Sequence, residues 1–150
     1  MIPTVPTLED MTFTLKQEIQ VNAPMDVTFA ALLEQLGPGN ETPDGKSLSL
    51  RIEPWPGGRW YRDLGNDNGH LWGHVQAIKR PTLLEFVGPI FASFPMLSNV
   101  QYRLTEADGG TLITFRHTAL GMLTSEHKME MPNGWSSMHE RVKRHAEAGR

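Results

Sequence analysis

The segment EPWPGGRWYRDLGNDNGHLWGHVQAIKRPTLLEF, residues 53–86, contains three short strand-like runs separated by turn-forming sequences. The runs are GRWYRDL, GHLWGHVQAIK and TLLEF. PGG leads into the first run, GNDNG separates the first from the second, and Arg80-Pro81 leads into the third. These sequences are rich in residues that begin turns or tolerate a positive φ. Runs of this length that are joined by tight turns predict consecutive antiparallel strands.

The flanking sequence continues this pattern on both sides. Apolar residues alternate with polar ones, as in strands, over residues 12–21, 47–55, 98–107 and 111–120. Asp108, Gly109 and Gly110 separate the last two runs and predict a hairpin. Helical spacing of apolar residues appears over 24–36, and again from Met131 to the end, where it predicts an amphipathic helix of about four turns. Grouped strands with helices at the ends indicate an α+β fold.

Composition excludes several classes of function. The chain has 150 residues, a formal net charge of −3 and no cysteine. Disulfides, thiolate catalysis and cysteine-ligated metal sites are therefore excluded, and nucleic acid and anionic membranes are not expected partners. Residues 1–11 have neither the basic region nor the apolar region of a secretory signal, and no apolar run is long enough to span a membrane. We therefore expect a soluble, cytoplasmic protein.

Four motifs follow one another along the chain: PGGRW at 56–60, G-x-V-x-x-I-x-x-P at 73–81, GGT-x-I-T-F-x-H at 109–117 and G-W-x-x-M at 134–138. In this order and spacing they resemble the START-like (SRPBCC) superfamily, and within it the bacterial relatives of the heat-shock chaperone ATPase activator. The resemblance implies a helix-grip (Bet v-like) fold, in which a curved antiparallel sheet wraps around a long C-terminal helix and encloses a cavity. It also implies one START-like domain over residues 12–148, preceded by a tail of residues 1–11.

The resemblance also implies which side chains face the cavity. It directs Ile78 inward, and strict alternation along the strand then turns Trp72, His74 and Gln76 toward the helix. Applied to the other strands and the helix, the same reasoning predicts an aromatic ligand-binding set. That set is Trp72, His74, Gln76, Phe86, Tyr102, Phe115, His117, Trp135 and Met138.

No metal or other cofactor is expected. On a strand, His70 and His74 lie on one face but about 13 Å apart, too far to share one ion. His70 is expected nearer the rim of the cavity. A metal site that combines His74 with His117 from another strand is geometrically possible.

Three functions are compatible with this sequence. The first is a domain that binds a hydrophobic or aromatic small molecule in an apolar cavity. The second is a cyclase- or dehydratase-like enzyme that uses His74, His117 or Tyr102 in acid–base chemistry. The third is a co-chaperone-like domain that binds a protein partner through its surface. Residues 121–134 are expected to form a loop at the cavity mouth, where loops gate access.

Overall fold

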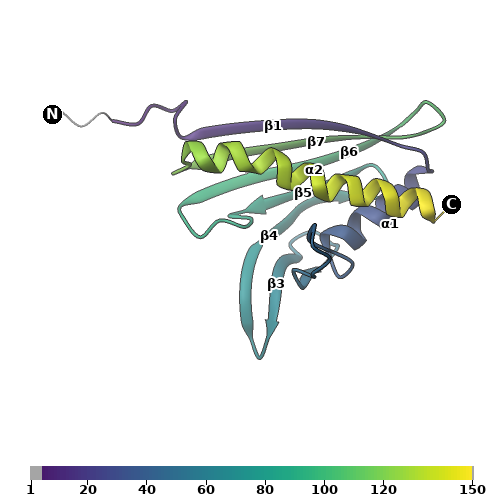
Figure 1. Ribbon diagram of the computed structural model, residues 1–150, viewed down its shortest axis with the longest axis horizontal. Coiled ribbons are helices and arrows are strands. Elements are labelled where there is room, and N and C mark those ends of the chain that lie inside the picture. The colour runs from purple at the N-terminus through teal and green to yellow at the C-terminus, as the bar shows by residue number, and fades with distance from the viewer. Residues whose placement is uncertain (1–4, 150) are drawn as a thin grey trace.

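The computed structural model describes residues 5–149, and its elements follow the order expected from the sequence (Figure 1). The elements are β1 (Thr12–Val21), α1 (Met25–Leu36), β2 (Leu50–Ile52), β3 (Arg59–Gly65), β4 (Asn68–Lys79), β5 (Leu83–Gly88), β6 (Met96–Ala107), β7 (Gly110–Gly121) and α2 (Ser125–Ala148).

The seven strands form one antiparallel sheet in the order β1-β7-β6-β5-β4-β3-β2. Strands β2 to β6 each pair with the next strand along the chain, and β1 joins the sheet beside β7. Helix α2 crosses one face of the sheet, and α1 packs against the C-terminal half of α2 (Figure 1). This arrangement confirms the expected α+β helix-grip fold.

The hairpin of β6 and β7 fixes the register at the centre of the sheet. Asp108 and Gly109 both have positive φ, at 51° and 76°, as the tight turns favoured in hairpins require. The two strands then pair continuously, so that Tyr102 lies opposite Phe115 and Val100 opposite His117. The predicted hairpin is confirmed.

Helix α2 is longer than the sequence pattern suggested. It begins at Ser125, so the expectation of a loop over residues 121–134 is wrong for most of that segment. Thr124 caps the helix, because its side chain accepts a hydrogen bond from the His127 amide while the His127 ring accepts one from the Thr124 amide. Pro132 lies inside the helix. Within residues 5–149, no helix has the length and apolarity needed to cross a membrane.

Strand β4 contains two irregularities that reverse its side-chain alternation. Against β3, Tyr61 pairs with Leu71 and Trp60 with Gly73, which leaves Trp72 as an extra residue. Against β5, the residue left over in the same way is Gln76. Each such bulge shifts the alternation by one residue.

The expected orientation of His74 and Gln76 is therefore wrong. Trp72 and Val75 are buried and Ile78 packs against the core, whereas the His74 and Gln76 side chains are exposed. Ile78 does face inward, as the resemblance implied. Strict alternation does not hold across the two bulges at Trp72 and Gln76.

Close packing of backbone explains the glycine at the first bulge. A Cβ atom on Gly73 would lie 2.6 Å from the Val87 carbonyl oxygen, and one on Gly88 would lie 2.4 Å from that of Trp72. The same Trp72 carbonyl accepts a hydrogen bond from the Ile90 amide at 2.7 Å. The bulge thus anchors the start of the loop between β5 and β6.

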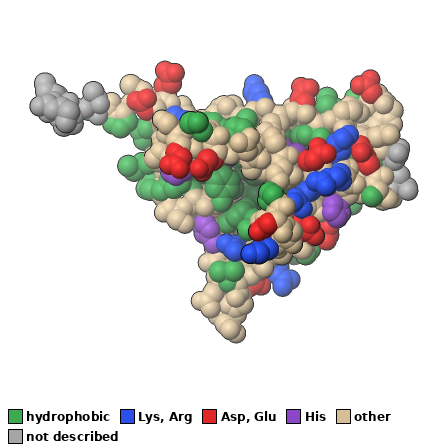
Figure 2. Space-filling view, in the orientation of Figure 1, with side chains coloured by type: hydrophobic (Ala, Val, Ile, Leu, Met, Phe, Trp, Pro, Cys, Tyr) green, Lys and Arg blue, Asp and Glu red, His purple; other side chains and the backbone are tan. Residues whose placement is uncertain are grey.

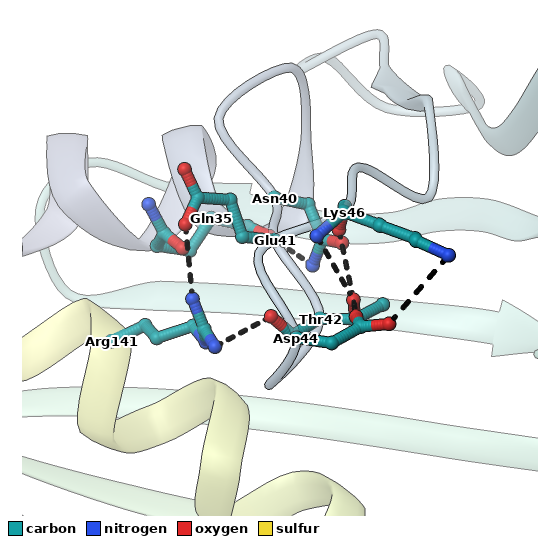
Figure 3. Close-up of polar contacts among 7 residues, drawn as sticks. All are labelled: Gln35, Asn40, Glu41, Thr42, Asp44, Lys46 and Arg141. Atoms are coloured by element: carbon teal, nitrogen blue, oxygen red, sulfur yellow. Dashed lines mark hydrogen bonds and ion pairs between the residues drawn. The ribbon is translucent and has the colours of Figure 1, made fainter.

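The loop between α1 and β2 is tied to α2 by a polar cluster (Figure 3). The Arg141 guanidinium donates to the Glu41 carboxylate at 3.2 Å and to the Thr42 carbonyl at 2.6 Å. Asn40 donates its side-chain amide to the Gln35 carbonyl at 2.9 Å. These contacts attach the segment that leads into β2 to helix α2, through Arg141, and to helix α1, through Gln35.

Candidate functional site

A pocket of about 590 Å³ lies between the N-terminal half of α2, the loop joining β5 to β6, and strands β3 and β4. Figure 2 shows hydrophobic side chains gathered in a hollow beside this half of α2. The aromatic and thioether side chains of its apolar wall are Trp72, Phe91, Phe94, Met131, Trp135 and Met138, and Leu48 adds to the same wall. Trp72, Met131 and Trp135 are buried, while Phe91 is 40% exposed and lies at the open side.

Three of the nine predicted ligand-binding residues line this pocket: Trp72, Trp135 and Met138. His74 and Gln76 lie on the outer face of the sheet. The other four, Phe86, Tyr102, Phe115 and His117, are fully buried and do not line it.

Packed rings fill the space where the sequence predicted a deeper cavity. Phe115 contacts Tyr102 at 5.0 Å and Trp135 at 4.9 Å between ring centroids. Phe86 stacks on Trp60 at 4.4 Å. The pocket therefore ends at Trp135 and Trp72, and the sheet behind them is closed core.

His117 is held by two hydrogen bonds that define its tautomer. The Trp135 indole donates to Nδ1 at 3.0 Å, so Nδ1 carries no proton. In the neutral ring the proton then lies on Nε2, which donates to the Ser98 hydroxyl at 2.8 Å. Burial lowers the pKa of His117 to about 4, which favours this neutral form. His117 thus positions Trp135 from behind the pocket.

His139, which the sequence reading missed, forms a second buried network. Its Nδ1 donates to the Gln17 side-chain oxygen at 2.7 Å, and its Nε2 accepts from the Tyr102 hydroxyl at 2.9 Å. Burial lowers the pKa of His139 to about 3 and raises that of Tyr102 well above its usual value. His139 also stacks on Trp135 at 5.8 Å.

The sequence carried a signal for His139. Positions 135, 139, 142 and 146 follow helical spacing and share one buried face of α2. Met138, which the sequence predicted to face the cavity, precedes His139 on the helix and is only partly buried. The aromatic wall from Phe91 and Phe94 had no comparable signal, since residues 90–97 lack a regular period.

Polar groups occupy the rim of the pocket on two sides. Arg62 and His70 are direct cross-strand neighbours on β3 and β4, and both line the pocket. Across from them, α2 contributes His127 and Glu130. His127 stacks on Phe94 at 4.1 Å, which joins the β5–β6 loop to the start of α2. His70 therefore lies at the rim, as expected.

The part of the chain that the structure describes, residues 5–149, contains no group of three or more metal-ligating side chains close enough to hold an ion. His74 and His117 are not brought together, since one is on the outer face and the other in the core. The pocket offers a concave aromatic surface with a polar rim, which suits a small organic molecule.

A sequence profile of the family described as Activator of Hsp90 ATPase homolog 1-like protein matches residues 22–147. The chain belongs to this family. This family match and the helix-grip fold confirm the resemblance to the START-like superfamily that the sequence motifs indicated. No functionally curated protein matches the chain.

Solved structures share the fold of this family member at low sequence identity. A putative uncharacterized protein from Rhizobium leguminosarum has 16% identity and a TM-score of 0.72, over 91% of this chain and 95% of that one. Ara h 8.0201 has 18% identity and a TM-score of 0.66, over 91% and 99%. The di-domain ARO/CYC protein StfQ, from the steffimycin biosynthetic pathway, has 13% identity and a TM-score of 0.65, over 94% of this chain and 51% of its own.

Proposed function

We propose that this chain is a small-molecule-binding domain that holds a hydrophobic or aromatic ligand in the pocket beside the N-terminal half of α2. The observation that carries the proposal is the wall of four aromatic and two thioether side chains around a space of about 590 Å³. Small-molecule sites commonly occupy ~300–1,000 Å³ and are lined mainly by such side chains.

The arrangement of the core supports binding over acid–base catalysis. Of the three candidate catalytic residues, His74 is on the outer face, and Tyr102 and His117 are sealed behind Trp135. Both ring nitrogens of His117 are engaged in hydrogen bonds. A proton acceptor must come within hydrogen-bond reach of its substrate, and a ligand in this pocket meets the Trp135 ring first.

The test uses the neutral fluorescent probe N-phenyl-1-naphthylamine and a variant that fills the pocket. Gly134 lines the pocket, and a Cβ atom added to it meets no atom within 4 Å. Gly134→Leu should therefore fold, with a helix stabilised by about 0.5–1 kcal/mol, and should weaken probe binding at least tenfold.

Asn133→Leu is the matched control, because Asn133 is exposed on the same helix and does not line the pocket. It should bind the probe as the native chain does. Equal probe binding by native protein and Gly134→Leu would overturn the proposal. Binding of a protein partner through the surface would survive Gly134→Leu, which separates the co-chaperone-like alternative from ligand binding.

A further inference from the structure

A positively charged side chain without a counter-ion lies at the mouth of the pocket. Arg62 follows the buried Trp60 on the inner side of β3, pairs with the buried Leu50 of β2, and is itself half-buried. Its Nε donates to the Leu48 carbonyl at 3.1 Å, which fixes the plane of the guanidinium. Among residues 5–149, neither terminal nitrogen of Arg62 has a hydrogen bond or an ion pair.

The carboxylates nearby do not neutralise Arg62. The adjacent Asp63 pairs with Arg51 at 3.3 Å on the other face of the strand. Glu130 lines the opposite wall of the pocket on α2 and makes no ion pair with Arg62. Positive charge is therefore concentrated on the sheet side of the mouth and negative charge on the helix side.

A second nitrogen donor stands beside the guanidinium. His70 is directly opposite Arg62 across the β3–β4 pair, where side chains on one face lie about 5 Å apart. Within the described chain the His70 ring has no hydrogen-bond partner, whereas His127 on the other wall is engaged with Thr124 and stacked on Phe94. Two adjacent donors, one of them a planar guanidinium, match the geometry of a carboxylate or sulfonate.

We propose that the pocket selects aromatic ligands that carry one anionic group, which Arg62 and His70 hold at the sheet side of the mouth while the ring contacts Trp72 and Trp135. This inference rests on the proposed function and names the ligand class of the same pocket. A neutral ligand would leave the Arg62 charge unpaired and partly desolvated, which costs binding free energy. An anionic group held by Arg62 and His70 also lies on the wall opposite Glu130, and so away from the negative charge of that carboxylate.

The experiment compares two probes with the same aromatic framework. One is 1-anilinonaphthalene-8-sulfonate, an anion, and the other is the neutral N-phenyl-1-naphthylamine. The native protein should bind the anion more tightly. Arg62→Gln should weaken sulfonate binding about tenfold, the loss typical of one charge-assisted hydrogen bond, and leave the neutral probe unchanged. Arg62→Lys should retain part of the preference, and Glu130→Gln should increase it.

Arg144→Gln is the control for net charge, because Arg144 is exposed on α2 and does not line the pocket. It should change neither affinity. If Arg62→Gln alters the two probes equally, or Arg144→Gln alters the sulfonate as much, the anion proposal is overturned while ligand binding stands. If Gly134→Leu weakens the binding of neither probe, or if neither probe binds the native protein, the proposed ligand-binding function is itself overturned.

Discussion

Trp135 contacts two buried imidazole rings, and these contacts fix the back wall of the pocket. It donates to His117 at 3.0 Å and stacks on His139 at 5.8 Å. Both histidines are at most 1% exposed, and each is hydrogen-bonded at both ring nitrogens. The two rings therefore serve as neutral structural groups in an aromatic core.

The buried histidines predict a loss of stability in mild acid. The pKa falls from 6.5 to about 4 for His117 and to about 3 for His139, in each case because of burial. Below pH 6.5, the pKa of a histidine in the unfolded chain, the unfolded chain therefore binds more protons than the folded chain. The free energy of unfolding is highest above pH 6.5 and declines as the pH falls toward the pKa of the folded state. Each histidine should contribute a slope of up to about 1.4 kcal/mol per pH unit to the free energy of unfolding.

Urea unfolding between about pH 6 and pH 4.5 measures this slope. His139→Gln should reduce the slope by up to about 1.4 kcal/mol per pH unit, whatever its effect on stability at neutral pH. The exposed Asn133 on the same helix has no titratable side chain and provides the control, since Asn133→Leu should leave the slope as it is in the native chain. Identical slopes in native protein and His139→Gln would contradict the assignment of His139 as a buried neutral group.

At the scale of elements, strand β4 determines which side chains reach the pocket. Two bulges bring Trp72 and Ile78 to the inner face and turn His74 outward. Alternation alone predicts the opposite orientation for His74. A bulge leaves the alternation intact on either side of it, but it exchanges the two faces of the sheet for the residues that follow. Gly73 in mid-strand was the available signal, since such a glycine often marks a bulge or a close backbone approach.

The same reasoning predicts opposite effects for two Gly→Ala substitutions. Gly73→Ala places a Cβ atom 2.6 Å from the Val87 carbonyl oxygen and should destabilise the protein by about 1–3 kcal/mol. Gly134→Ala meets no neighbouring atom within 4 Å and should stabilise α2 by up to about 1 kcal/mol. Chemical denaturation distinguishes them, and a stability for Gly73→Ala equal to that of the native protein would refute the close packing at the bulge.

Helix α2 shows where local sequence rules fail. Pro132 and Gly134 disfavour a helix that passes through them, because proline removes a backbone donor and glycine is a poor helix former. The structure continues the helix because Met131 and Trp135 are buried on one of its faces, and the Gln17 side chain donates to the Pro132 carbonyl at 3.2 Å. Tertiary contacts of this kind are absent from the local pattern.

At the scale of the whole molecule, periodicity and turn signals were sufficient for the order of the elements and for the α+β class, and the resemblance implied the helix-grip arrangement. The position of the pocket was not predictable in the same way. It depends on how far the rings of Phe86, Tyr102 and Phe115 fill the space between sheet and helix, and on where Phe91 and Phe94 extend from an irregular loop. Both the filling of this space and the positions of Phe91 and Phe94 depend on tertiary packing between the sheet and the helix.

The central claim, that a small aromatic ligand binds beside the N-terminal half of α2, is tested most directly by the indole N–H signals of the four tryptophans. Trp72 and Trp135 line the pocket, Trp60 is buried behind it, and Trp55 is 56% exposed outside it. Titration of ¹⁵N-labelled protein with N-phenyl-1-naphthylamine should shift the Trp72 and Trp135 signals most and leave that of Trp55 in place. A titration that shifts the Trp55 signal alone, or none of the four, would contradict the account.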